Sequence, residues 1–243
     1  MKKCPRCMKT EENDFTRFCK HCGTELFFIN RFPGNDSTGV KKTMRKTEQS
    51  RRSYNKKAAY YENTQDGRVT RPLKRMIINA VEVQNGQTVV DVACGTGDLI
   101  AAVAKKANIQ VHGIDIAEQM IAVAKERYQG ISFSVAPAYP LAFDELSVDT
   151  IMVSAAFHHF EQPQRFATEC KRVLRPGGKV YIGEFNVPTV ARYIMNFLIK
   201  FAKTGDVKIY SDLELASFFI NAGFEITDIL TDGPRIVLIC EKR

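Results

Sequence analysis

The stretch from Val89 to Asp98 reads VVDVACGTGD. Its apolar start predicts a buried strand, its end predicts the first turn of a helix, and Gly95 and Gly97 fall in between. Glycine lets the backbone turn tightly and pass close to a ligand. The stretch therefore predicts a ligand site at the carboxyl end of a parallel sheet, although an ordinary strand–helix connection has the same pattern.

From about residue 51, short apolar segments alternate with longer amphipathic ones, which is typical of βα units around a parallel sheet. The strands expected from this alternation cover residues 87–91, 110–115, 131–135, 148–154 and 179–185. The expected helices cover residues 97–107, 117–128, 164–174 and 212–222. Two further strands, 224–230 and 236–241, flank a turn that reads TDGP and predict a hairpin. The predicted fold class is α/β and Rossmann-like.

Two acids accompany the glycine-rich turn. Asp115 ends the next strand, where a carboxylate accepts hydrogen bonds from ribose hydroxyls, so it predicts a nucleoside ligand without fixing the reaction. The turn reads A-x-G-x-G rather than the G-x-G-x-x-G of dinucleotide sites. Asp91 would repel a pyrophosphate but can bind a cationic amino-acid group. A nicotinamide oxidoreductase is therefore only a remote alternative.

Together, Asp91-x-Ala93-x-Gly95-x-Gly97, Asp115 and the run RVLRPGG at 172–178 resemble the motifs of class I S-adenosylmethionine-dependent methyltransferases. The most similar branch contains the ubiquinone and menaquinone C-methyltransferases, and the resemblance covers roughly residues 50–241. It implies a seven-stranded sheet whose last two strands form the antiparallel hairpin. It also implies an enzyme that uses S-adenosylmethionine.

The resemblance assigns the cofactor's parts to separate strand ends. Asp115 would bind the ribose, Ile116 would pack on the adenine, and Ala136, Pro137 and Ala138 would border the adenine. Pro137 stands where the family usually has an acid, so adenine binding would be weaker or rest on the Ala138 N–H and packing. The methionine part would be held by Asp91 and the turn that contains Ala93, Cys94, Gly95 and Gly97.

The substrate side of the site is implied by two other segments. Residues 154–160 read SAAFHHF and would lie beside the transferable methyl group, with Ser154 at the cofactor and His158 as a possible general base. The alternative is that one histidine caps the strand and the other faces solvent. Residues 51–61 resemble a lid helix whose Tyr61 closes over the cofactor, or else a packed amphipathic helix. Residues 186–210 would cover the substrate, join the core or form a dimer face.

The N-terminal residues predict a separate metal site. Cys4, Cys7, Cys19 and Cys22 form two C-x2-C pairs, whose four thiolates suit a closed tetrahedral Zn²⁺ site. A redox dithiol pair is the alternative. The expected domains are a zinc ribbon over 1–27, a basic flexible linker over 28–50 and a methyltransferase domain over 51–243.

Charge is unevenly distributed along the 243 residues. The formal net charge is +8; residues 1–60 hold 15 Lys and Arg against 6 Asp and Glu, and the remainder is close to neutral. The sequence shows no membrane span and no apolar signal core at its start, so a cytoplasmic protein is expected. A small-molecule acceptor is favoured, with RNA or protein recruited through residues 1–57 as the alternative. A non-catalytic protein that binds the cofactor or has a regulatory role is a more distant alternative.

Overall fold

The computed structural model describes residues 2–3, 10–11, 37–202 and 204–243, and describes side chains from Lys46 onward. The chain divides into two units, Met1–Gly39 and Val40–Arg243. In the first unit, strand β1 (Lys2–Lys3) pairs antiparallel with β2 (Thr10–Glu11). The four cysteines of the predicted zinc site lie outside the described residues.

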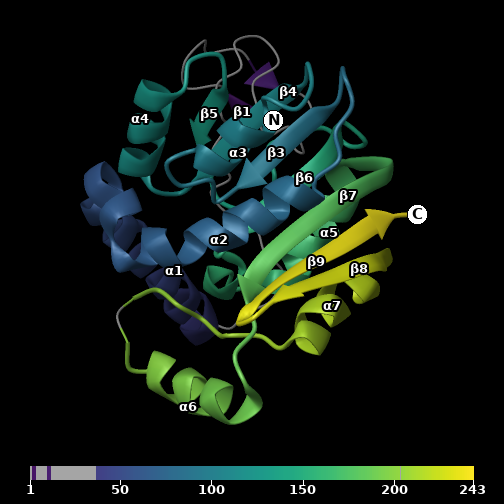
Figure 1. Cartoon of the computed structure of the whole chain (residues 1–243). Helices are drawn as coiled ribbons and strands as arrows, with labels where there is room; N and C mark the ends of the chain where they lie inside the picture. Colours follow the sequence, from purple (N-terminus) through teal and green to yellow (C-terminus); the bar gives the residue numbers. More distant parts are fainter. Residues whose placement is uncertain (1, 4–9, 12–36, 203) are drawn as a thin grey trace. The chain divides into compact units, whose positions relative to one another are not determined.

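The second unit is built on a seven-stranded mixed sheet with the order β5-β4-β3-β6-β7-β9-β8 (Figure 1). The first five strands in this order run parallel, and β9 runs antiparallel to both of its neighbours, β7 and β8. The predicted α/β, Rossmann-like sheet with an antiparallel C-terminal hairpin is confirmed. The strands are β3 (Thr88–Val92), β4 (Gln110–Asp115), β5 (Ser132–Val135), β6 (Val148–Ser154), β7 (Leu174–Phe185), β8 (Phe224–Asp232) and β9 (Arg235–Lys242).

Helices cover both faces of the sheet because the parallel strands are apolar on both sides. On β3, Val89 packs in the hydrophobic cluster that contains α2 and α3, whereas Val90 and Val92 pack in the cluster that contains α5 and α7. The helices are α1 (Ser37–Lys57), α2 (Gln65–Ala80), α3 (Asp98–Val103), α4 (Glu118–Arg127), α5 (Pro163–Val173), α6 (Thr189–Ile199) and α7 (Asp212–Asn221). Two 3₁₀ helices, η1 (Ala58–Asn63) and η2 (Phe157–His159), complete the set in this unit.

The expected linker over 28–50 is wrong for its second half. Residues 37–50 are the first part of α1, and the second unit begins at Val40 rather than at residue 51. This basic stretch contains few apolar residues, so the sequence has no apolar periodicity that would predict the helix. Helix α2 was also not predicted, although Leu73 and Ile77 lie four residues apart and are fully buried.

Two other boundaries differ from the prediction. Strand β7 begins at Leu174, not at residue 179, because Leu174 pairs with Val148 and Lys179 pairs with Thr150, with an irregularity between them. Helix α3 begins after Gly97, whose φ of 84° lies in the left-handed region, and ends at Val103. No helix among the described residues is long and apolar enough to cross a membrane.

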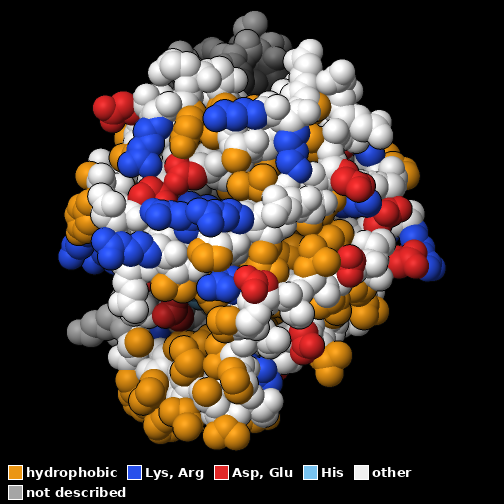
Figure 2. All heavy atoms as spheres, viewed as in Figure 1, with side chains coloured by type: hydrophobic (Ala, Val, Ile, Leu, Met, Phe, Trp, Pro, Cys, Tyr) orange, Lys and Arg blue, Asp and Glu red, His pale blue; other side chains and the backbone are white. Residues whose placement is uncertain are grey.

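Helix α6 exposes a large apolar surface. Orange side chains gather over it in Figure 2. The Lys46 side chain donates hydrogen bonds to the Ile199 and Ala202 carbonyls, so the end of α6 is attached to α1. The exposed apolar residues of α6 and the turn after it are Val190, Tyr193, Ile194, Met195, Phe197, Leu198 and Phe201.

Phe157→Ala is expected to lower the free energy of unfolding by about 3–5 kcal/mol. The Phe157 ring is fully buried. Phe201→Ala, at a side chain that is 73% exposed, is the control and should change stability by less than about 0.5 kcal/mol. Urea unfolding of both variants measures the difference; equal effects would show that Phe157 is not a core residue. The rings around Phe157, with centroids at 5.4–6.0 Å, are Phe160, Phe166, Tyr210, Phe218 and Phe219.

Candidate active site at the carboxyl edge of the sheet

A cavity of about 930 Å³ lies beyond the carboxyl ends of the parallel strands. After β3 the chain continues to β4 and β5 on one side and later returns to β6 on the other, so the cavity sits at the topological switch point. Four strand ends contribute to its wall. These contributions are Ala93 after β3, Asp115 on β4, Ala136 after β5 and Ser154 on β6.

Asp115 connects the first two of these strand ends. Its Oδ1 accepts a hydrogen bond from the Ala117 N–H at 2.8 Å, and its Oδ2 accepts one from the Gly95 N–H at 2.9 Å. Burial raises the pKa of Asp115, and the two amides oppose this shift. Each carboxylate oxygen keeps a lone pair, so Asp115 can hold the glycine turn and still accept hydrogen bonds from a ligand's hydroxyls.

Asp91 lies below the cavity wall rather than in it. Its side chain is 1% exposed, and its Oδ2 has no hydrogen-bond partner in the structure. Burial raises the pKa of Asp91 to about 8, although the positive charge of Lys74 lowers it in part. A buried carboxyl oxygen without a partner is costly, and a cationic group at the turn would both satisfy it and favour its ionised form.

The stability of the free protein should report the protonation state of Asp91. The folded state keeps a proton that the unfolded state releases at about pH 4, so between about pH 4 and 8 the unfolded state binds fewer protons. The contribution of Asp91 to the free energy of unfolding should therefore fall with rising pH, by about 1.4 kcal/mol per pH unit, and level off above pH 8.

Urea unfolding of the wild type and of Asp91→Asn between pH 5 and 9 tests this expectation. Asparagine does not titrate, so the difference between the two unfolding free energies isolates the carboxyl group. The free energy of unfolding of the wild type should fall relative to that of Asp91→Asn as the pH rises from 5 to 8. A difference that is constant over this range would mean that Asp91 is already ionised at pH 5.

The loop after β5 places Pro137 and Ala138 in the cavity wall beside Ala136. The Ala136 N–H donates to the Asp115 carbonyl at 2.9 Å, which fixes the loop against β4. Because Pro137 lacks both an N–H and a polar side chain, this part of the wall offers shape and apolar contact rather than a hydrogen-bonding acid. Ile116 lies in the wall on the β4 side.

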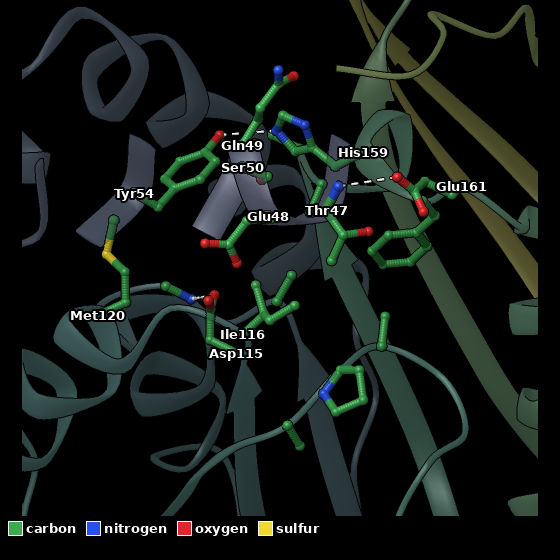
Figure 3. A pocket seen from close by; sticks show the side chains of 18 of the residues that line it. Thr47, Glu48, Gln49, Ser50, Tyr54, Asp115, Ile116, Met120, His159 and Glu161 are labelled. Atoms are coloured by element: carbon green, nitrogen blue, oxygen red, sulfur yellow. Dashed lines mark hydrogen bonds between the residues drawn. The ribbon is translucent and has the colours of Figure 1, made fainter. Parts of the chain in front are cut away.

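The opposite wall comes from α1, whose Glu48 and Tyr54 are labelled in Figure 3, and from η1, which contributes Tyr61. Tyr54 and Tyr61 line the cavity, and the Glu48 carboxylate points into it. Hydrogen bonds from Arg51 at 2.8 Å and Arg52 at 2.6 Å lower the pKa of Glu48 to about 2. Above the floor formed by the strands, this wall therefore carries an ionised Glu48 whose charge is paired with those of Arg51 and Arg52.

The two histidines after β6 have different surroundings. Although burial opposes it, the Glu184 carboxylate, 3.0 Å from Nδ1, raises the pKa of His158. Burial and the neighbouring His158 lower the pKa of His159 to about 4, so His159 is neutral at pH 7. His159 lines the cavity and its Nε2 lies 3.0 Å from the Tyr54 hydroxyl (Figure 3). His158 was the possible base predicted from the sequence, whereas the structure places His159 in the cavity wall and pairs His158 with Glu184.

Most of the predicted cofactor residues meet in this one cavity, and the others support it from behind. Cys94 is a buried free thiol, and a Cβ on Gly97 would lie 2.8 Å from the Phe133 ring, so both shape the turn by packing. Lining residues that the sequence analysis missed include Thr47, Glu48, Gln49, Ser50, Met120, Tyr139 and Glu161. Those on α1 precede the glycine motif by about forty residues, and no motif connects them to it. The predicted residues in the wall are Tyr61, Ala93, Gly95, Asp115, Ile116, Ala136, Pro137, Ala138 and Ser154.

Comparison with known proteins finds similarity in the part of the chain that forms the floor of the cavity. Residues 90–182 match the family described as a methyltransferase domain. The chain is 33% identical over 138 residues to the demethylmenaquinone methyltransferase of Thermotoga maritima, covering 55% of the chain and 60% of that relative. It is 35% identical over 120 residues to the enzyme of the same name from Renibacterium salmoninarum, covering 49% and 50%. The matched part thus spans between half and three-fifths of these curated relatives.

The fold is also similar to solved structures. A chain in the complex of the Haloferax volcanii Trm112 methyltransferase activator with a methyltransferase superposes with a TM-score of 0.67. The match covers 77% of this chain and 96% of that one at 20% sequence identity. At this identity the similarity concerns the fold alone.

Proposed function

We propose that this chain transfers a methyl group from S-adenosylmethionine to a small, largely apolar acceptor. The observation that carries the proposal is the cavity at the switch point, where Asp115 and the Gly95 turn meet in one wall. The methyltransferase domain match over residues 90–182 and the demethylmenaquinone methyltransferase relatives support the same reaction.

The described residues fit the cofactor. The unpartnered Oδ2 of Asp91 and the unpartnered Oγ of Ser154 lie at two of the strand ends around the cavity. Gly95 has a φ of 55° and open space where a Cβ would be, so a ligand can approach its backbone closely. S-adenosylmethionine supplies a methyl group bound to a positively charged sulfur. In our proposal Asp115 accepts the ribose hydroxyls, and Asp91 stabilises the cationic amino-acid part.

The protein's own contribution to the transfer is alignment and exclusion of water, since attack on a methyl group depends mainly on in-line geometry. Tyr54 and His159, joined by their hydrogen bond, hold a proton at the cavity wall.

The acceptor that we propose is a quinol-like aromatic with an apolar tail. Tyr139 and Phe160 line the cavity and offer aromatic surface for such a ring, and the exposed apolar face of α6 lies on a helix attached to α1. The names of the relatives in Thermotoga maritima and Renibacterium salmoninarum support this class. The positive charge of residues 1–60 favours RNA as the alternative acceptor.

A methyl-transfer assay with radiolabelled S-adenosylmethionine separates these acceptors. The purified chain is incubated with a prenylated dihydroxynaphthalene in one reaction and with total RNA in another. We expect label in the organic extract of the first reaction and none in the RNA of the second. Label in RNA alone would contradict the proposed acceptor, and the absence of S-adenosylmethionine binding by calorimetry would contradict the proposed reaction.

We further propose, from sequence spacing alone, that Cys4, Cys7, Cys19 and Cys22 bind a structural Zn²⁺ ion. The ribbon would form a unit separate from the catalytic one. Its zinc content, measured by elemental analysis, should fall by one equivalent in Cys4→Ser/Cys7→Ser. An unchanged zinc content in this variant would contradict the assignment.

A further inference from the structure

Three potential metal ligands converge behind the cavity wall. His158 and His159 belong to η2, and Asp206 lies on the connection between α6 and α7. The Oδ1 of Asp206 lies 3.7 Å from the Nε2 of His158 and 3.2 Å from the Nδ1 of His159. All three ligand atoms lie within 4.8 Å of one another, and no other group of this kind occurs among the described side chains.

Each of the three side chains is oriented by a further hydrogen bond. Glu184 holds the Nδ1 of His158 at 3.0 Å, which leaves Nε2 directed toward Asp206. The Tyr54 hydroxyl engages the Nε2 of His159, and the Thr204 hydroxyl donates to the Oδ2 of Asp206 at 2.5 Å. The remaining atom of each side chain therefore faces the other two. Carboxylate and hydroxyl partners that orient ligands in this way are a regular feature of metal sites in proteins.

The Nδ1 of His159 is the atom that points to a missing partner. It is buried and makes no hydrogen bond of good geometry, although the Asp206 Oδ1 lies 3.2 Å away and the Gly205 backbone also approaches the ring. The His159 side chain is 11% exposed, so water replaces such a bond poorly. An unsatisfied buried nitrogen destabilises the folded state, and a metal ion would satisfy it.

The separations suit a tetrahedral ion. Zinc lies about 2.0–2.1 Å from imidazole nitrogen and about 2.0–2.2 Å from carboxylate oxygen, so neighbouring ligand atoms are roughly 3.4 Å apart. The distances from the Asp206 Oδ1 to His159 Nδ1 and to His158 Nε2, 3.2 and 3.7 Å, lie on either side of this value. We propose that His158, His159 and Asp206 bind a divalent transition-metal ion of the zinc type, with the fourth position open to water.

The ion would fasten the segment around residue 206 to the end of β6. The Val207 N–H already donates to the His158 carbonyl at 2.9 Å. Gly205 packs so closely on α1 that a Cβ there would lie 2.5 Å from the Ser50 nitrogen. A metal ion at this point thus joins η2, the α6–α7 connection and, through Tyr54, helix α1. We infer that it fixes the cavity wall, and this inference does not depend on the identity of the methyl acceptor.

Titration of the metal-free full chain with Co²⁺ tests the proposal and separates it from the cysteine site. Cobalt bound by thiolates shows an intense sulfur-to-metal absorption, whereas cobalt bound by nitrogen and oxygen shows only weaker visible bands. We expect one equivalent with the sulfur signature and a second equivalent without it. In Cys4→Ser/Cys7→Ser, the second type of signal should remain.

Asp206→Asn should weaken the second equivalent by at least about 100-fold, because an amide is a poor ligand for this ion. Glu184→Gln should weaken it about 10- to 100-fold by loosening His158. Asp228→Asn, at an exposed residue of β8, is the matched control and should bind both equivalents normally. Circular dichroism verifies that each variant is folded. The proposal is overturned if the wild type binds no second equivalent, or if folded Asp206→Asn binds it as tightly as the wild type.

Discussion

Asp115→Asn is expected to weaken the binding of S-adenosylhomocysteine by at least about 100-fold. In the proposed site the Asp115 carboxylate accepts charge-assisted hydrogen bonds from the ribose, each worth about 1.5–3 kcal/mol. Two such bonds correspond to about two orders of magnitude in the dissociation constant. The Gly95 N–H and the Ala117 N–H both donate to the Asp115 carboxylate. An asparagine amide would turn its own NH2 donor toward one of these two N–H groups.

Isothermal titration calorimetry of the wild type and the variant measures this loss. Asp144→Asn, at an exposed residue before β6, changes the net charge by the same amount and should bind normally. Thermal unfolding shows whether the variant retains its fold. If folded Asp115→Asn binds S-adenosylhomocysteine as tightly as the wild type, Asp115 does not contact the ligand. The main support for a nucleoside ligand would then be lost.

Gly97→Ala is expected to destabilise the protein far more than Gly86→Ala, although the two glycines have nearly the same φ, 84° and 83°. Both substitutions force alanine into the left-handed region, at a cost of about 1–2 kcal/mol. Only the Cβ at residue 97 would collide with the core: it would lie 2.8 Å from the Phe133 ring and 3.2 Å from Ala124, whereas nothing lies within 4 Å at residue 86.

The overpacking should add about 1–3 kcal/mol in Gly97→Ala alone. Urea unfolding of the two variants under one set of conditions gives the comparison, and the shared strain cancels in the difference. Equal stability losses would show that Phe133 can move aside. The second glycine of the motif would then serve the turn's conformation rather than the packing of the helix on the sheet.

The sheet was predictable because its strands are short apolar runs with clear ends. The β3 strand, the TDGP hairpin and the acid that ends β4 follow from local sequence, and each lies within a few residues of its expected place. The floor of the cavity was predictable for the same reason, since it consists of the residues at the strand ends.

The opposite wall of the cavity, formed by α1 and η1, was not predictable from local sequence pattern. Glu48 and Ser50 lie on a helix of basic and polar residues, and only the tertiary structure places them opposite Asp115. The choice between His158 and His159 depends on the rotation of a single 3₁₀ turn and on Glu184, which is twenty-six positions further along the chain. Neither relation leaves a periodic signal in the sequence.

The floor and the opposite wall of the cavity come from separate parts of the chain, so one can change in sequence while the other stays the same. The floor comes from strand ends after residue 90, in the part of the chain that matches the methyltransferase-domain family, while α1 and η1 supply the opposite wall from residues before it. Substitutions in residues 47–61 can reshape the space left for an acceptor without altering the strand ends beneath. Exchange of this helical segment alone would thus change the shape of the cavity and keep the residues of its floor.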